Sequence, residues 1–307
     1  MEFLIVGPGA MGCLFAARLF NAGYRVTLLD HNEKRAEEIN RNGITVQGIS
    51  GDYTAGVPVR TETSGVTPDI VFICVKSGKT ADAAASIKAL VKEDTLIATL
   101  QNGVGNIEIL EEILGRDKIT GGVTSEGATS LGIGKIRHAG SGSTVLGPGQ
   151  KFRKALDKLV EALNKAGFSA GSADNVDDLI WGKLIINVGI NALTAITGLK
   201  NGQIPLFEGT LDIMKDAVQE AVAVSKAKNI NLPYDDPLNK VLEVCRNTSG
   251  NIASMLQDVL NKRTTEIDFI NGAICREGEK AGISTPVNHT LTRLIKTIES
   301  SYDERLL

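Results

Sequence analysis

Hydrophobic positions along the first half of the chain follow two alternating patterns. Short apolar runs predict buried strands, and the longer segments between them have helical periodicity. The predicted strands cover residues 3–6, 25–29, 70–75 and 95–100, and the predicted helices cover 11–22, 33–42, 80–91 and 106–114. This alternation is typical of a parallel sheet with helices on both faces. Glycine-rich residues 44–61 predict an inserted hairpin, and residues 121–147 predict further strands closing the sheet.

The pattern changes after a predicted helix at residues 152–165. From residue 175 onward the chain reads as consecutive helices, with almost no strand signal. A length of 307 residues also exceeds what one hydrophobic core usually supports. We therefore expect an α/β domain over residues 1–170 and an all-helical domain over residues 171–307.

One predicted helix, residues 180–198, is almost wholly apolar. It carries Lys183, Asn187 and Asn191 at spacings of four residues, so these side chains share one face. Lys183 is the only charged residue between Ile180 and Leu199. Burial would lower the basicity of this lysine and make it a usable proton donor near neutral pH. The alternative is a polar stripe that faces water or caps a neighbouring loop.

The first predicted strand leads directly into a glycine-rich turn. The turn carries Gly7, Pro8, Gly9, Ala10, Met11 and Gly12, and it opens the first predicted helix. In this context a GxGxxG string indicates a Rossmann-type dinucleotide-binding domain, with the pyrophosphate at the helix N-terminus. A glycine-rich turn without a ligand is the alternative.

Asp30 ends the second predicted strand, 18 residues after Gly12. A carboxylate there can accept both ribose hydroxyls of NAD and would repel the 2′-phosphate of NADP. The nearby cations of Lys34 and Arg35 could partly neutralise such a phosphate. Locally, Asp30 favours NAD without deciding the matter.

A second polar group follows in the helical half. Asn251, Ser254 and Asp258 have the spacing of one helical face. Glu266 and Asp268 lie among apolar residues, so we expect at least one carboxylate to face inward, with Lys183 as the candidate cation. The alternative is a surface ion pair of Glu266 with a neighbouring basic residue.

Composition and charge indicate which kinds of partner are not expected. The net charge is −3 and no dense basic patch occurs, so neither nucleic acid nor a membrane is an expected partner. Four scattered cysteines and three histidines lack metal-ligand spacing, so no metal site is expected. The chain runs straight into a strand without a basic segment, which favours a cytoplasmic location.

Several motifs in both halves resemble the ketopantoate reductase (2-dehydropantoate 2-reductase) family. They are Gly7-x-Gly9-x-x-Gly12, Gln-Asn102-Gly103-Val, Trp-x-Lys183-Leu-x-x-Asn187-x-x-x-Asn191-x-Leu-Thr-Ala, Asn201-Gly, Ser254-Met-Leu-Gln-Asp and Thr-Glu266-Ile-Asp-x-Ile-Asn-Gly. They occur in order, with very similar spacing, over nearly the whole chain. The resemblance implies a Rossmann domain, a helical domain and an active site in the cleft between them.

The resemblance also implies an activity and a set of site residues. The activity is reduction of 2-dehydropantoate to (R)-pantoate, a step of pantothenate and coenzyme A biosynthesis, with NADP as cofactor. Lys183 matches the proton donor, and Glu266 a residue near the reacting centre that contacts the cofactor. Asn187, Asn191, Asn201 and Ser254 match substrate-binding positions, to which we add Asn251 as a candidate donor. Asn102 matches a position touching both ligands, and Lys76 and Ala128 match cofactor contacts.

One departure from the family pattern keeps alternatives open. NADPH-using members typically place an arginine just after the second strand, where this chain has Asp30 and His31. The second hypothesis is an NAD-linked (R)-2-hydroxyacid dehydrogenase acting on another branched or aromatic 2-keto acid. The third is a catalytically silent nucleotide-binding redox sensor, although a sensor needs no proton donor. A homodimer is possible.

Overall fold

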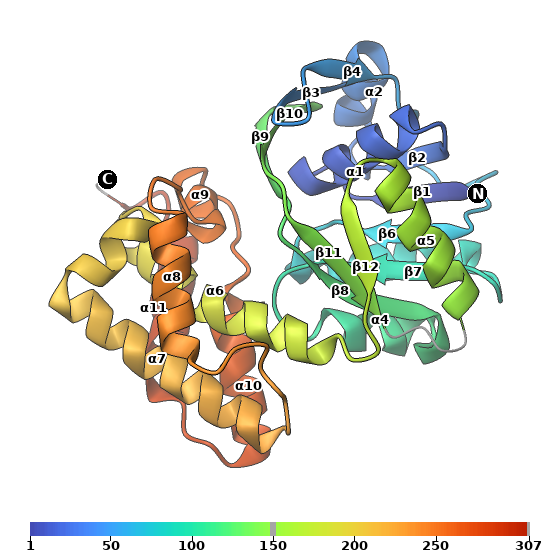
Figure 1. Ribbon diagram of the computed structural model, residues 1–307. Coiled ribbons are helices and arrows are strands. Elements are labelled where there is room, and N and C mark those ends of the chain that lie inside the picture. The colour runs from blue at the N-terminus through green and yellow to red at the C-terminus, as the bar shows by residue number, and fades with distance from the viewer. Residues whose placement is uncertain (148–151, 306–307) are drawn as a thin grey trace. The chain divides into compact units, whose positions relative to one another are not determined.

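The computed structural model describes residues 1–147 and 152–305, which form two compact units. The first unit contains residues 1–101 and 106–176, and the second contains residues 102–105 and 177–307 (Figure 1). The expected boundary at residue 170 thus lies six residues earlier than the observed one. The chain stays in the first unit because β12 (Ser169–Ser172) pairs with the preceding strand and Ala173 donates to the Leu146 carbonyl.

The first unit is built on an eight-stranded sheet with the order β12-β11-β8-β7-β6-β1-β2-β5. Its strands, besides β12, are β1 (Glu2–Val6), β2 (Arg25–Leu29), β5 (Val59–Arg60), β6 (Ile70–Ile73), β7 (Leu96–Thr99), β8 (Ile119–Thr124) and β11 (Ser143–Gly147). Every neighbouring pair is parallel except β8 and β11. The α/β class expected from the alternating pattern is confirmed.

The helices of this unit follow their predicted ranges closely. They are α1 (Ala10–Asn21), α2 (Glu33–Asn42), α3 (Thr80–Ile87), α4 (Asn106–Leu114) and α5 (Arg153–Lys165), with short 3₁₀ turns η1 (Ser77–Lys79), η2 (Lys88–Leu90) and η3 (Arg116–Lys118). The helix expected over residues 80–91 is therefore α3 followed by η2. The α2 helix ends at Gly43, whose φ of 73° is a conformation that favours glycine.

A second, four-stranded sheet has the order β4-β3-β10-β9. It comprises β3 (Ile44–Gly48), β4 (Tyr53–Ala55), β9 (Gly127–Gly132) and β10 (Lys135–Gly140). The expectation that all of residues 121–147 extend the main sheet was wrong for β9 and β10. These strands instead join the β3–β4 hairpin, which buries Ile136 together with Ile44 and Val46.

The main sheet buries apolar side chains on both faces. Successive residues of β1 alternate between two clusters, Phe3 and Ile5 in one, Leu4 and Val6 in the other. The first cluster contains side chains of α1 and α5, and the second contains side chains of α3 and α4. This two-sided burial explains why the strands read as continuous apolar runs.

The second unit is all helical apart from its short connecting turns. It comprises α6 (Asp177–Thr197), η4 (Asn201–Leu206), α7 (Glu208–Ala227), α8 (Pro237–Asn247), α9 (Ser254–Leu260), η5 (Ile267–Phe269), α10 (Asn271–Ala281) and α11 (Pro286–Ser300). Its core is a single apolar cluster to which α6 contributes more buried residues than any other helix. A Cβ at Gly189 would lie 2.8 Å from Val241 and 3.1 Å from Val218, so glycine lets α6 approach α7 and α8 closely.

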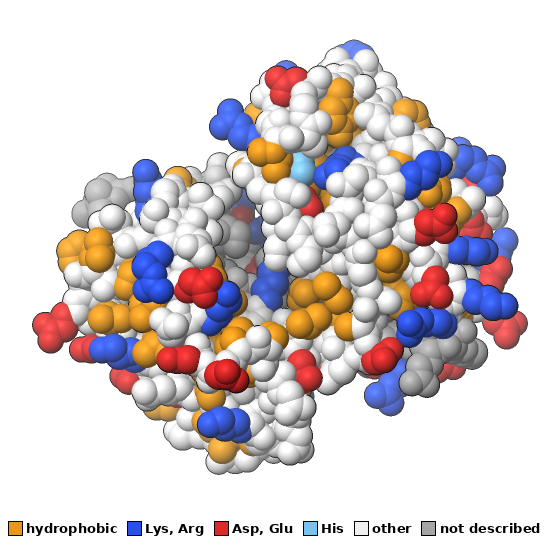
Figure 2. Space-filling model, viewed as in Figure 1, with side chains coloured by type: hydrophobic (Ala, Val, Ile, Leu, Met, Phe, Trp, Pro, Cys, Tyr) orange, Lys and Arg blue, Asp and Glu red, His pale blue; other side chains and the backbone are white. Residues whose placement is uncertain are grey.

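Length and composition alone would allow α6 to cross a membrane. However, 67% of its most apolar 18-residue window is buried within the protein. The helix therefore serves as the core of a globular unit. On the viewed face of the molecule, Lys and Arg side chains are interspersed with Asp and Glu, without an extended patch of one sign (Figure 2).

The first core gives a direct test of the packing. The ring of Phe15 in α1 stacks on the ring of Phe72, with 5.3 Å between the ring centroids. The centroid of the Phe168 ring lies 4.7 Å from that of Phe15, and all three side chains are buried. We predict that Phe15→Ala lowers the free energy of unfolding by about 3–5 kcal/mol, since it leaves a cavity between two elements. Urea denaturation followed by circular dichroism measures the change.

The matched control is Ile49→Ala, because Ile49 lies in the same unit with 57% of its surface exposed. Its truncation should change the free energy of unfolding by no more than about 0.5 kcal/mol. Equal losses in the two variants would contradict the assignment of Phe15 to a tightly packed core.

Candidate active site

The turn between β1 and α1 has a geometry that only glycine allows at two positions. Gly7 has a φ of +105°, and a Cβ there would lie 2.8 Å from Val75. A Cβ at Gly12 would lie only 2.0 Å from the Gly7 carbonyl oxygen. These two glycines therefore let the strand, the turn and the helix pack closely.

Gly9 differs, because nothing in the packing demands glycine there. A Cβ at this position would meet no atom closer than the Cys74 carbonyl oxygen, at 3.8 Å. Gly9 is exposed, and as the N-cap of α1 it has no side chain with which to cap the helix. A bare helix N-terminus with open space beside it fits a pyrophosphate, and Pro8, Ala10 and Met11 complete the turn.

The end of β2 carries a partly buried ion pair between Asp30 and Arg35. Both carboxylate oxygens of Asp30 accept hydrogen bonds from Arg35, through Nε and Nη2. The Asn32 backbone N–H also donates to Asp30 Oδ1, at 3.0 Å. The Asp30 side chain is fully buried, whereas the Arg35 side chain keeps 33% of its surface exposed. The preference for NAD that Asp30 suggested from the sequence stays a prediction.

Lys76 follows β6 and is exposed. Its turn is held by Gln101, whose Nε2 donates to the Val75 carbonyl at 2.8 Å and to Thr80 Oγ1 at 2.9 Å. Sequence reasoning missed this role of Gln101, although the residue opens the Gln-Asn-Gly motif. Ala128 lies in β9, half-buried, opposite His138 of β10.

Lys183 lies on α6 in the second unit, and its side chain is half-buried. Desolvation lowers its pKa from 10.5 to about 8, while the negative charge of Glu266 acts in the opposite direction. An amine with a pKa near 8 can both hold and release a proton close to neutral pH. The expectation that a carboxylate from the 266–268 segment faces this lysine therefore agrees with the electrostatics.

Asn102 joins the same group of residues from the segment 102–105. Its Nδ2 donates to Glu266 Oε2 at 3.2 Å. The segment is anchored by the Val104 N–H, which donates to the Phe269 carbonyl at 2.9 Å. Gly103 has a φ of +86°, and a Cβ there would lie 2.1 Å from the same carbonyl oxygen. Glycine at position 103 is thus required for this close approach.

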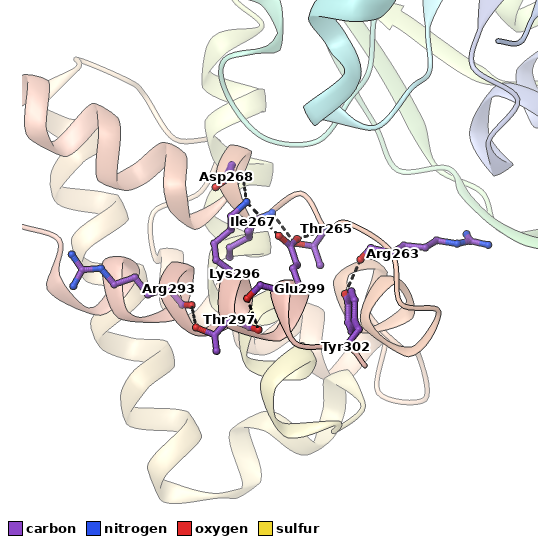
Figure 3. A network of polar contacts seen from close by, with 10 residues as sticks. Arg263, Thr265, Ile267, Asp268, Arg293, Lys296, Thr297, Glu299 and Tyr302 are labelled. Carbon is purple, nitrogen blue, oxygen red and sulfur yellow. Dashed lines mark hydrogen bonds and ion pairs between the residues drawn. The ribbon is translucent and has the colours of Figure 1, made fainter. Parts of the chain in front are cut away.

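The segment that carries Glu266 is fastened to α11 on both sides (Figure 3). Before it, the Thr265 N–H donates to Glu299 at 2.7 Å, and after it, Asp268 pairs with Lys296 at 2.8 Å. Lys296 also pairs with Glu299 at 3.3 Å. These contacts fasten the chain on either side of Glu266. Of the residues that make them, Thr265, Lys296 and Glu299 were not singled out by sequence reasoning.

The predicted substrate-binding residues all lie in the second unit. Asn187 and Asn191 lie one and two turns beyond Lys183 on α6. Asn201 is buried, and its Nδ2 donates to Thr248 at 2.9 Å. Its Oδ1 is buried and has no hydrogen-bond partner among residues 1–147 and 152–305.

The structure changes the interpretation of Asn251. The spacing suggested one helical face for Asn251, Ser254 and Asp258, but α9 begins only at Ser254. Asn251 precedes the helix in an irregular segment, and its carbonyl accepts a hydrogen bond from the Asn201 N–H at 3.1 Å. Asn251 and Ser254 are both exposed, while Asp258 is buried.

The two units thus carry different functional groups. The first has a turn that fits a dinucleotide pyrophosphate, and the second has an ammonium of lowered pKa beside a carboxylate and several amides. Such a combination defines the class of oxidoreductases that use a nicotinamide dinucleotide.

Comparison with known proteins identifies the family within this class. The family model described as ketopantoate reductase PanE/ApbA matches residues 3–151, and the model of its C-terminal region matches residues 175–299. The chain belongs to the ketopantoate reductase family.

Relatives and solved structures agree over the full length. The chain is 33% identical to the 2-dehydropantoate 2-reductase of Pyrococcus horikoshii, over 98% of each chain. It is 31% identical to that of Vibrio cholerae, over 99% of this chain and 100% of the relative. A ketopantoate reductase structure from Ralstonia eutropha matches with a TM-score of 0.91 and 32% identity, over 99% and 100% of the two chains. A D-mandelate dehydrogenase with NADH and anilino(oxo)acetate matches with a TM-score of 0.90 and 28% identity, over 99% of each chain.

The electrostatics of Lys183 can be tested without any substrate. We predict that the Lys183 amine titrates near pH 8 and that Glu266→Gln moves this titration to lower pH, because the anion that raises the pKa is removed. Competitive acylation at a series of pH values, read by mass spectrometry of the peptide containing Lys183, measures both.

Other peptides of the same sample, which contain exposed lysines such as Lys226, serve as internal references. A Lys183 titration that Glu266→Gln leaves unchanged would show that the carboxylate does not act on this lysine.

Proposed function

We propose that the chain is a 2-dehydropantoate 2-reductase, with Lys183 as the proton donor. The observation that carries this proposal is the lowered pKa of Lys183 beside Glu266, which is itself bound by Asn102. Full-length relatives of the same name support the substrate.

The bound reduced nicotinamide would supply the hydride. Hydride delivery to a ketone leaves negative charge on its oxygen, and the Lys183 ammonium can neutralise and protonate that oxygen. Glu266 keeps the ammonium charged at neutral pH by opposing the desolvation that lowers its pKa. Neutral polar groups that can bind the carboxylate and the hydroxyl of 2-dehydropantoate are offered by Asn187, Asn191, Asn201, Asn251 and Ser254.

The surroundings of the cofactor would be supplied by the first unit. The open helix N-terminus at Gly9 would hold the pyrophosphate, with Lys76 and Ala128 as further contacts. We also infer a reducing, cytoplasmic location, which the four free cysteines support.

A lysine that donates the proton should be essential for turnover. We predict that Lys183→Ala lowers kcat for reduction of 2-dehydropantoate by at least about 10²-fold, within the range of general-acid contributions. In the wild type, kcat/KM should fall as pH rises through about 8, because the donor loses its proton there. Steady-state kinetics with reduced cofactor measures both quantities.

Lys226→Ala removes an exposed lysine from the same unit and should leave kcat unchanged. A decrease of less than about threefold in Lys183→Ala would exclude the proton-donor role.

The second candidate is an NAD-linked (R)-2-hydroxyacid dehydrogenase. The observation that favours it is the structural match to D-mandelate dehydrogenase, at a TM-score of 0.90. The two candidates share the same donor chemistry, because pocket walls rather than Lys183 select the side chain of the keto acid.

A matrix of rates separates the two candidates. We predict that kcat/KM for 2-dehydropantoate exceeds that for phenylglyoxylate and for 2-ketoisovalerate by at least about tenfold, the discrimination that one well-fitted group provides. Each substrate is assayed with NADPH and with NADH. A higher value for phenylglyoxylate would overturn the first candidate in favour of the second.

A further inference from the structure

A buried cluster of polar side chains lies at the carboxyl ends of β6 and β7. These strands are parallel neighbours, so the segments that follow them lie side by side. The cluster, which we call the Thr80 cluster, consists of Ser77, Thr80, Thr99, Gln101 and Asn106. Its members are buried, except Gln101, which is half-buried. Because buried polar groups need partners, a cluster whose members satisfy one another also fixes the segments that carry them.

The Thr80 hydroxyl is the centre of this cluster. It accepts a hydrogen bond from Gln101 Nε2 at 2.9 Å. Its own proton faces two acceptors, the Ser77 carbonyl at 2.8 Å and Asn106 Oδ1 at 2.9 Å. A hydroxyl offers one donor and two lone pairs, so all of its capacity is used here. Three neighbours therefore meet at one oxygen atom, and each is placed relative to the other two.

The Gln101 amide is held by a hydrogen bond from each of its groups. Besides its bond to Thr80, Nε2 donates to the Val75 carbonyl at 2.8 Å, and Oε1 accepts from Thr99 Oγ1 at 2.8 Å. Such an amide has a single favourable orientation, because turning it over would place like groups against each other.

The Thr80 cluster holds the chain on both sides of Lys76. The carbonyl before it, that of Val75, accepts from Gln101, and the carbonyl after it, that of Ser77, accepts from Thr80. Lys76 itself is exposed. Its backbone is thus fixed while its side chain remains accessible to a ligand.

The same cluster holds both ends of the segment that supplies Asn102. The chain leaves the first unit after Gln101 and returns at Asn106. The side chains of these two residues contact the same atom, Thr80 Oγ1. Residues 102–105 therefore form a loop whose ends are joined through one hydroxyl. Asn102, which donates to Glu266, comes directly after the first of these ends.

We propose that Thr80, Gln101 and Asn106 are positioning residues of the proposed reaction, and that they act through Lys76 and Asn102. This inference rests on the proposed function, because that function is what gives Lys76 and Asn102 contacts with ligands. The three residues fix the chain beside these two and do not themselves touch a ligand. Misplacing a contributing group by about 1 Å can lower turnover by about 10²-fold, so their loss should affect catalysis.

Hydrogen exchange tests the hold on the segment without cofactor or substrate. Thr80→Val removes the central hydroxyl and keeps the shape of the side chain, so Gln101 and Asn106 both lose this partner. We expect amide exchange in peptides covering residues 102–105 to become at least about tenfold faster than in the wild type. Mass spectrometry of the full chain measures it.

The matched control is Thr95→Val. Thr95 is also buried, and its hydroxyl accepts from the Lys92 N–H at 3.1 Å and donates to the Pro68 carbonyl at 3.2 Å. It lies just before β7, at the opposite end of this strand from Gln101. The control therefore removes a comparable buried hydroxyl and should leave exchange in residues 102–105, kcat and KM unchanged.

Steady-state kinetics with 2-dehydropantoate tests the effect on the reaction. Thr80→Val should lower kcat by at least about tenfold through Asn102, and raise KM for the reduced cofactor through Lys76. Thr80→Ser retains the hydroxyl and should keep kcat within about threefold of the wild type. In an Asn102→Ala background, Thr80→Val should lower kcat by less than about threefold, because residues that act through one another are not additive.

If Thr80→Val does not fold, Gln101→Met removes Nε2 from a half-buried position and should give the same results. Unchanged exchange in residues 102–105, equal losses of kcat in Thr80→Val and Thr95→Val, or a loss that persists in the Asn102→Ala background would overturn the positioning role. A wild type that does not reduce 2-dehydropantoate, with the selective change in exchange intact, would overturn the proposed substrate and support the hold of the Thr80 cluster on the segment.

Discussion

The contacts around Glu266 in the second unit depend on the burial of one ammonium group, that of Lys183. Lys183 is the only charged residue between Ile180 and Leu199, the apolar part of α6 that contributes to the unit's core, and desolvation lowers its pKa to about 8. Without the opposing charge of Glu266 the pKa would lie lower still. The carboxylate must therefore be held in place, and this requirement accounts for the contacts made by its neighbours. Thr265 and Asp268 are fastened to α11, and Asn102 binds the carboxylate directly.

A buried charge is also paired with an opposite charge in the first unit. Asp30 is buried and would be costly alone, and Arg35 satisfies both of its oxygens. In each unit an acidic residue is matched with a basic one, Asp30 with Arg35 and Glu266 with Lys183.

Much of this was predictable from the sequence, for definite physical reasons. The alternation of apolar runs and helical segments identified the parallel sheet, because strands buried on both faces are continuously hydrophobic. The spacing of Lys183, Asn187 and Asn191 placed them on one face of α6, since helical periodicity is local. Pairings that depend on distant residues were not predictable. The β9 and β10 strands were assigned to the wrong sheet, Asn251 was placed on a helix that begins later, and the contact between Arg35 and Asp30 was missed.

The segment 102–105 has a consequence for how this kind of protein can diversify. The chain leaves the nucleotide unit after Gln101, supplies Asn102 and Val104 to the helical unit, and returns at Asn106. A fragment starting at Asp177 would therefore lack the residues that bind Glu266 and the Phe269 carbonyl. The two units are not interchangeable modules, because exchanging the nucleotide unit as one piece also replaces part of the substrate unit. Recombination that respects this fold must cut the chain at three places rather than one.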